Sequence, residues 1–185
     1  MDSDSSSAPT PKGWHRGSPP SAWVVRFAGL VPPGSTVLDL ACGAGRHTRF
    51  FAERGHPVVA VDRDLRGIED LRGNPSIESH ELDLEDGGPF PFAGRTFGAV
   101  VVANYLYRPV LGNLVEAVGP GGALIYETFA RGNERFGTPK NPDFLLEPGE
   151  LLDVARPALQ VVAYEDLQVE EPKPAAVQRI AAVRR

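Results

Sequence analysis

The chain has 185 residues, of which 42% are hydrophobic and 23% are charged, and its formal net charge is -5. This length and apolar content supply one hydrophobic core and are too small for two full domains. The negative charge argues against a surface that binds phosphate backbones over its whole extent. The single cysteine, Cys42, excludes a disulfide framework and a site with several cysteine ligands. His15, His56 and His80 lack the spacing of metal ligands, so we expect no bound metal.

The first residues differ in composition from the rest of the chain. Residues 1–17 begin acidic, are rich in serine and proline, and lack the apolar stretch of a secretory signal. No later stretch approaches a membrane-spanning run. We therefore expect a disordered leader over residues 1–17, a single domain over residues 18–185, and a cytoplasmic protein that does not contact membranes.

The first half of the chain alternates helical and strand patterns. A helix is expected to begin with Ser18 as its cap and Pro19 as its first residue, and a strand follows over residues 36–40. The next helix ends near Gly55, before a second strand over residues 56–61. Asp64 is a candidate cap for a short helix with apolar residues three apart, and a third strand is expected over residues 77–82.

The second half continues the alternation. The apolar run at residues 97–103 is typical of a strand buried on both faces. A helix follows in which Val110, Leu114 and Val118 recur at four-residue intervals, and then a strand over residues 123–129. We expect a short helix at residues 151–155 and a hairpin of two strands at the end, over residues 159–169 and 175–183. This order predicts an α/β sandwich around a mostly parallel sheet.

Residues 37–48 read Val-Leu-Asp-Leu-Ala-Cys-Gly-Ala-Gly-Arg-His-Thr, and they join the first strand to the second helix. Such junctions bind nucleotide-like ligands, because glycine lets bare backbone approach the ligand. A dinucleotide site, however, needs a third glycine where this chain has Thr48, and the charge of Asp39 would oppose a pyrophosphate. The same charge of Asp39 would instead attract a cationic ligand. Asp62, at the end of the second strand, suits the two hydroxyls of a ribose.

This constellation resembles motif I and the acidic strand-two motif of the class I S-adenosylmethionine-dependent methyltransferases, and the resemblance covers most of the chain. It implies a Rossmann-like three-layer sandwich whose seven-stranded sheet is mostly parallel, with the last strand antiparallel. It also implies S-adenosyl-L-methionine as the cofactor. Residues 89–97 resemble the family's link into its fourth strand, although Gly98 stands where many members carry an acid.

The resemblance assigns a role to each part of the predicted cofactor site. Asp39 would face the methionine amino group, and Asp62 would hold the ribose hydroxyls. Gly43 and Gly45 would pass the backbone beneath the cofactor. The remaining candidates follow the ends of the first four strands, with Asp83 and Leu84 at the position that reads adenine: Ala41, Arg63, Asp83, Leu84 and Asn104.

Methyl transfer is an in-line displacement, so the enzyme must mainly align the reactants and exclude water. The acceptor belongs beyond the carboxyl ends of the strands, where Tyr105, Tyr107 and Arg108 are candidate catalytic residues. The long loop over residues 130–147 is a candidate for closure over the substrate. An anionic or soft nucleophile drawn by Arg108 or Arg131 needs no base, whereas an alcohol or amine requires removal of a proton.

Three functions stay open at this point. The first is methyl transfer to a small-molecule acceptor, since the pattern is closest to tellurite-resistance and thiol-type methyltransferases. The second takes RNA or protein as the acceptor, using the basic loop and the three arginines near the end of the chain. Base methylation is disfavoured, because residues 104–107 lack the two prolines of the Asn-Pro-Pro-Tyr motif. The third is a cofactor-binding partner subunit without catalysis. The oligomeric state is open.

Overall fold

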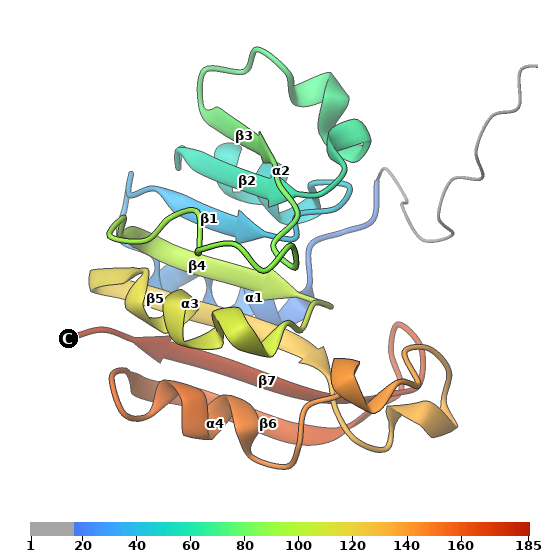
Figure 1. Cartoon of the computed structure of the whole chain (residues 1–185). Helices are drawn as coiled ribbons and strands as arrows, with labels where there is room; N and C mark the ends of the chain where they lie inside the picture. The colour runs from blue at the N-terminus through green and yellow to red at the C-terminus, as the bar shows by residue number, and fades with distance from the viewer. Residues whose placement is uncertain (1–16) are drawn as a thin grey trace, which may run out of the picture.

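The fold is built around one seven-stranded sheet with the order β3-β2-β1-β4-β5-β7-β6 (Figure 1). The computed structural model describes residues 17–185, so all but the last residue of the predicted leader lies outside the described residues. The strands are β1 Val37–Leu40, β2 Val58–Asp62, β3 Ile77–Glu81, β4 Phe97–Ala103, β5 Val118–Phe129, β6 Gln160–Val169 and β7 Ala175–Val183. Only β7 pairs with its two neighbours in antiparallel fashion. The predicted sheet is confirmed.

Short helices cover both faces of this sheet. The α-helices are α1 Ala22–Phe27, α2 Arg46–Ala52, α3 Leu111–Glu116 and α4 Glu150–Ala155. Turns of 3₁₀ helix are η1 Ala28–Leu30, η2 Leu65–Leu71, η3 Arg108–Val110, η4 Asn133–Arg135 and η5 Pro142–Phe144. Helices α1 and α2 lie on one face, and α3 and α4 lie on the other (Figure 1). Within residues 17–185 no helix is long and apolar enough to cross a membrane.

The core lies in two layers on either side of the sheet, because successive strand residues point to opposite faces. Val37 packs with Phe50 and Phe51 of α2, whereas Leu38 packs with Leu114 of α3. The central strand β4 is covered on both faces, which explains its uninterrupted apolar sequence. Three layers therefore form, as the family resemblance implied.

Two predicted boundaries were wrong. The cap of α1 is Ser21, whose side chain accepts hydrogen bonds from the backbone N–H groups of Trp23 and Val24. A serine does cap the helix, but it is the one three residues after the predicted Ser18. Ser18 instead lines a cavity. Val118 is the first residue of β5 and pairs with Phe97. A buried strand and a further helical turn both call for an apolar residue at this position, so the sequence pattern does not distinguish them.

The predicted helix after Asp64 is confirmed as a 3₁₀ helix, and Asp64 is its cap. The side chain of Asp64 accepts a hydrogen bond from the backbone N–H of Arg66 at 3.0 Å. Apolar residues spaced three apart match the three residues per turn of this helix type. Ile68 departs from helical geometry inside it and is buried against Cys42 and Ala60.

Gly98, which departs from the family pattern, is required by its neighbour Ser35. A Cβ atom at Gly98 would overlap the Ser35 side chain, whose hydroxyl donates to the carbonyl of Pro32 at 2.6 Å. An acidic side chain at this position would collide in the same way. The space that a larger residue would fill is already occupied by serine.

We therefore expect Gly98→Ala to lower the free energy of unfolding by about 1–3 kcal/mol, the usual cost of overpacking. Gly112→Ala is the control, because no atom lies within 4 Å of the added Cβ on α3. That substitution should preserve stability or raise it by up to about 1 kcal/mol. Urea unfolding of both variants checks the prediction. Equal midpoints would contradict it and mean that Ser35 moves aside without cost.

Candidate functional site

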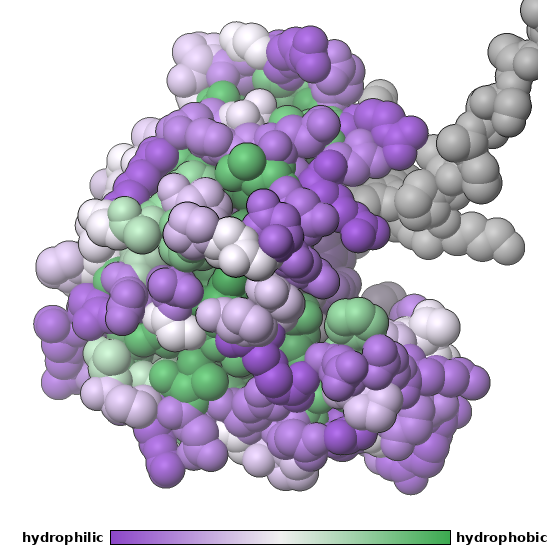
Figure 2. Space-filling view, in the orientation of Figure 1, coloured by the Kyte–Doolittle hydropathy of each residue, from purple (hydrophilic) through white to green (hydrophobic). Residues whose placement is uncertain are grey.

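A large cavity opens at the carboxyl ends of the parallel strands, and its volume is about 770 Å³. The space-filling view shows the molecule hollowed at this edge, between the half that carries β2 and β3 and the segment of residues 130–147 (Figure 2). The sheet order reverses here, because β1 lies between β2 and β4. Ligands of open α/β sheets bind at such a switch point. The volume is within the range of ligand sites.

The backbone is turned sharply where β1 and β4 end at the cavity. Ala41 follows β1 with a φ of 53°, and Asn104 follows β4 with a φ of 58°. They are the only residues other than glycine between 17 and 185 with positive φ, and both line the cavity. This conformation costs of order 1 kcal/mol or more at each residue and is found where a site demands it. The strain is concentrated on the two strands that flank the switch point.

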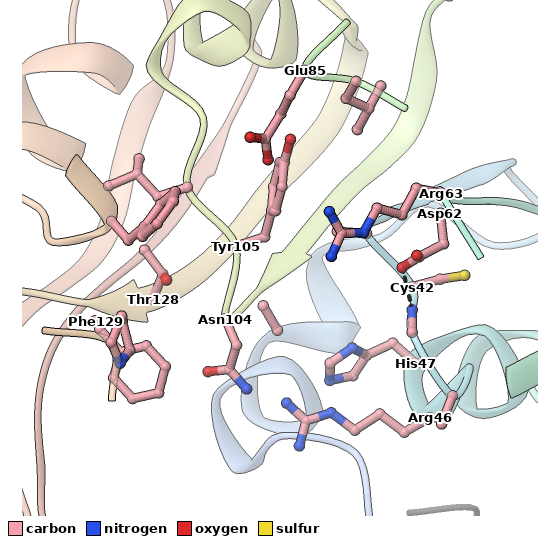
Figure 3. Close-up of a pocket in the computed structure, with 18 of the residues that line it drawn as sticks. Cys42, Arg46, His47, Asp62, Arg63, Glu85, Asn104, Tyr105, Thr128 and Phe129 are labelled. Atoms are coloured by element: carbon pink, nitrogen blue, oxygen red, sulfur yellow. Dashed lines mark hydrogen bonds between the residues drawn. The ribbon is translucent and has the colours of Figure 1, made fainter. Parts of the chain in front are cut away.

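Asp62 joins the loops that follow β1 and β2. The backbone N–H of Gly43 donates to Asp62 Oδ2 at 2.9 Å, and the N–H of Asp64 donates to Oδ1 at 3.1 Å (Figure 3). Burial raises the pKa of Asp62, while these N–H groups act in the opposite direction. A carboxylate has about four acceptor positions, so Asp62 retains capacity toward the cavity that it lines.

Asp39 lies beneath the glycine-rich loop and does not line the cavity. Its side chain is 1% exposed, and the hydroxyl of Thr48 donates to Oδ2 at 2.6 Å. Burial raises the pKa of Asp39 to about 6, against the effect of the Thr48 hydrogen bond. Its predicted contact with a ligand amino group stays a prediction.

His47 places a neutral ring beside this carboxyl group. The backbone N–H of Ser21 donates to Nε2 at 3.1 Å, so the ring carries its proton on Nδ1, which lies 4.0 Å from Asp39 Oδ1. Burial lowers the pKa of His47 to about 3. The ring therefore supplies no positive charge to balance Asp39.

The structure brings most of the predicted site residues together in the cavity. Those that line it are Ala41, Gly43, Asp62, Arg63, Asp83, Leu84, Asn104 and Tyr105. Gly45 does not line it, and a Cβ at Gly45 would overlap Ile68. Tyr107 also lies outside it and packs, half buried, against the core. Their predicted roles at the site gain no geometric support.

Arg108 also lies outside the cavity, and its guanidinium group is used inside the protein. It forms a paired contact with the Glu150 carboxylate at 2.7 and 2.9 Å. It also donates to the carbonyls of Asp143 and Leu145 at 2.7 and 2.8 Å. This arrangement fixes the end of the 130–147 loop against α4. Arg108 is therefore not positioned to attract an anionic acceptor.

Tyr105 and Glu85 form a polar pair on the cavity wall. Their hydroxyl and carboxylate groups point toward each other, and both residues line the cavity (Figure 3). The Tyr105 hydroxyl is buried and makes no well-formed hydrogen bond with residues 17–185. Burial, followed by the Glu85 charge, raises the pKa of Tyr105. The phenol is neutral at physiological pH.

Several lining residues were missed by sequence reasoning: Ser18, Ala44, Leu82, Glu85, Thr128, Phe129, Thr138, Pro139 and Lys173. Thr128 and Phe129 end β5, so the rule that ligands bind beyond strand ends could have found them. No local signal indicates Lys173, because only the folded hairpin brings it to the cavity. Among residues 17–185 no group of three or more potential ligands is arranged for a metal ion.

Residues 37–122 match the family model described as a methyltransferase domain. The chain is 35% identical over 137 residues to a demethylmenaquinone methyltransferase from Corynebacterium urealyticum, a match that covers 71% of this chain and 55% of that protein. It is 31% identical over 105 residues to a malonyl-[acyl-carrier protein] O-methyltransferase from Salmonella typhimurium, covering 54% of this chain and 41% of that protein. The chain thus spans about half the length of the curated relatives it matches.

Solved structures show the same fold. TehB from Haemophilus influenzae superposes with a TM-score of 0.71 at 19% identity, over 88% of this chain and 61% of that one. A TehB-like S-adenosylmethionine-dependent methyltransferase from Corynebacterium glutamicum gives a TM-score of 0.64 at 21% identity, over 91% and 90% of the two chains. Residues 37–122 thus match a methyltransferase domain, and the chain has the fold of the S-adenosylmethionine-dependent methyltransferases among these structures, which supports the resemblance found in its sequence.

The buried contact between Thr48 and Asp39 predicts a titration shift. Thr48→Val removes a hydrogen bond to the ionised carboxylate, so the pKa of Asp39 should rise above its value of about 6. Because that pKa already exceeds the unfolded value of 3.8, the contribution of Asp39 to stability is largest below about pH 4 and falls as pH rises to about 6.

Carboxyl carbon NMR across pH measures this shift directly. Thr96→Val, at an exposed position, is the matched control and should leave the Asp39 midpoint unchanged. An Asp39 midpoint that is the same in the Thr48→Val variant as in the parent protein would show that the hydroxyl does not stabilise the charge.

Proposed function

We propose that this protein binds S-adenosylmethionine in the cavity and transfers its methyl group to a small-molecule acceptor. The observation that carries the proposal is the Asp62 carboxylate at the switch point, held at 2.9 Å by the Gly43 backbone N–H and turned to the cavity. Charge-assisted hydrogen bonds from ribose hydroxyls are the partners that this carboxylate suits. The relatives are named methyltransferases, and a structural neighbour is an S-adenosylmethionine-dependent one, which supports the same class of reaction and the same cofactor.

The charges around the glycine-rich loop favour a cationic ligand over a pyrophosphate. Asp39 lies beneath the loop and Asp62 lies beside it, while His47 is neutral. Thr48 stands where a dinucleotide site has its third glycine, and its hydroxyl is bonded to Asp39. Arg46 and Arg63 also line the cavity, but a diphosphate on the loop would lie against the Asp62 carboxylate, with the buried Asp39 beneath it. A sulfonium and an ammonium group would instead be stabilised.

The bound cofactor supplies an electrophilic methyl group, and the residues of the chain supply position. Asp62 and Asp83 would anchor the nucleoside. The strained backbone at Ala41 and Asn104 would contact the cofactor from the ends of β1 and β4 and fix its position. Tyr105, next to Glu85, would hold or relay the proton of an acceptor that must lose one. Alignment and exclusion of water are sufficient for a soft nucleophile.

A small-molecule acceptor is favoured over RNA, because two of the C-terminal arginines already bind groups of the protein itself. Arg179 forms an ion pair with Glu127 at 3.2 Å, and Arg184 donates to the carbonyl of Val118 at 2.6 Å. One relative is named a demethylmenaquinone methyltransferase, which supports the same choice. The one cysteine, Cys42, is buried and unpaired, which fits a cytoplasmic location.

Asp62→Ala should weaken binding of S-adenosylmethionine by about tenfold to a hundredfold, since it removes charge-assisted hydrogen bonds worth about 1.5–3 kcal/mol. Isothermal titration measures the change. Asp153→Asn, at an exposed position of α4, is the control for loss of one carboxylate. A thermal unfolding scan shows that the variant is folded. Unaltered affinity in folded Asp62→Ala would contradict the ribose assignment.

The activity itself is tested with radiolabelled S-adenosylmethionine and a panel of thiols, oxyanions, phenols and amines. We expect transfer of the label to at least one of these acceptors, together with product inhibition by S-adenosylhomocysteine. Binding without transfer to any acceptor or to cell extract would support a non-catalytic partner subunit. Binding of a nicotinamide or flavin dinucleotide in place of S-adenosylmethionine would overturn the proposal.

A further inference from the structure

The cavity continues beyond the predicted cofactor residues into a second half with a different lining. Figure 3 shows Thr128 and Phe129 on the opposite side of Asn104 from Asp62 (Figure 3). This half is formed by the end of β5, the 130–147 loop and the turn between β6 and β7. Its lining residues are Thr128, Phe129, Thr138, Pro139, Phe144 and Lys173. No cofactor role predicted from the sequence falls on any of them.

Two aromatic rings give this half an apolar surface. Phe129 ends β5, and Phe144 belongs to η5 in the loop. Phe144 is 45% exposed, so much of its ring has no protein partner. Covering such a ring with the apolar part of a ligand is favourable by about 25 cal/mol for each Å² removed from water. An apolar, ring-bearing acceptor matches this surface better than a small oxyanion does.

Lys173 supplies the positive charge of this half. It lies in the turn between β6 and β7 and lines the cavity. Within the described part of the chain it has no ion pair or hydrogen bond. The acids of the same turn, Glu170 and Glu171, do not line the cavity. The carboxylates that do line it belong to the other half, since Asp62 is the last residue of β2, and Asp83 and Glu85 follow β3.

Arg108 and Arg131, which the sequence analysis suggested would attract an anionic acceptor, bind other groups of the protein. Arg108 is bound to Glu150 and two carbonyls. Arg131 donates to the Glu147 carboxylate at 2.8 Å and does not line the cavity. Arg46 and Arg63 also line the cavity, but they come from α2 and from the end of β2. Among residues 17–185, Lys173 is thus the one lining cation that the β5 end, the 130–147 loop and the β6–β7 turn contribute.

We infer that the acceptor is an amphipathic anion, with an apolar ring against Phe129 and Phe144 and a carboxylate, sulfonate or phosphate at Lys173. The inference rests on the proposed function, because it describes the second substrate of the same site. Lys173 then determines specificity for the acceptor and takes no part in holding the cofactor. An anionic group would gain a charge-assisted contact that a neutral analogue lacks.

The test compares two probes that differ in charge alone, naphthalene-2-carboxylate and naphthalene-2-carboxamide. Each is titrated by NMR into the complex of the full chain with S-adenosylhomocysteine. We expect the carboxylate to bind about tenfold more tightly, as one charge-assisted contact predicts. Lys173→Ala should abolish this preference while the affinity for S-adenosylhomocysteine stays unchanged. Phe144→Ala should weaken both probes by a similar factor.

Lys140→Ala is the matched control, because Lys140 is exposed on the neighbouring loop and does not line the cavity. It should retain the preference for the carboxylate. Equal affinity of the two probes, binding of neither probe, or a preference that survives in Lys173→Ala would overturn the inference. Failure of the proposed function is a different result, since S-adenosylhomocysteine itself would then not bind.

Discussion

The hydrogen bond from the Gly43 backbone N–H to the Asp62 carboxylate is the contact on which the site depends. It joins the loop after β1 to the end of β2, two neighbouring strands whose connection runs through the whole of α2. Glycine permits the approach, since the φ of Gly43 is 58°. The carboxylate is thus oriented before any ligand arrives. A preoriented group loses little entropy on binding, which is how a small domain obtains a specific site.

The same edge of the sheet contains groups whose burial or backbone conformation lowers the stability of the fold, and contacts elsewhere must offset that cost. Asp39 is buried with a raised pKa and a neutral histidine beside it. Ala41 and Asn104 adopt left-handed backbone conformations. The covered strands β1 and β4, which are almost fully buried, supply the compensating apolar contacts. A ligand with positive charge near Asp39 would relieve part of this electrostatic cost.

The sequence predicted the sheet and many of the residues that line the cavity, and the reasons are local. Strands β4 and β7 have the expected bounds because their apolar runs are long and ended by turn residues. Asp62 and Asn104 reach one cavity because carboxyl ends of parallel strands share an edge. Boundaries failed where two patterns give the same signal, as at Val118, which is buried in a strand but also continues a helical spacing.

The acceptor half could be predicted only in part. The end of β5 and the 130–147 loop follow from the rule that ligands bind beyond strand ends, but the residues that would reach the cavity do not. Lys173 reaches the cavity only through the β6–β7 hairpin, and Phe144 only through the path of the 130–147 loop. Arg108 is the converse case, a predicted site residue to which the structure gives no geometric support. Its position after β4 suggested a role at the site, but a nearby carboxylate and two carbonyls bind it first.

Amide NMR spectra recorded while S-adenosylhomocysteine is added test most directly whether this edge of the sheet holds the cofactor. The Gly43 and Asn104 amide signals should shift strongly in a saturable manner, because these residues flank the switch point, and NAD should leave them in place. The opposite pattern, in which the dinucleotide shifts the two signals or S-adenosylhomocysteine shifts only signals remote from the cavity, would contradict the assignment of the site.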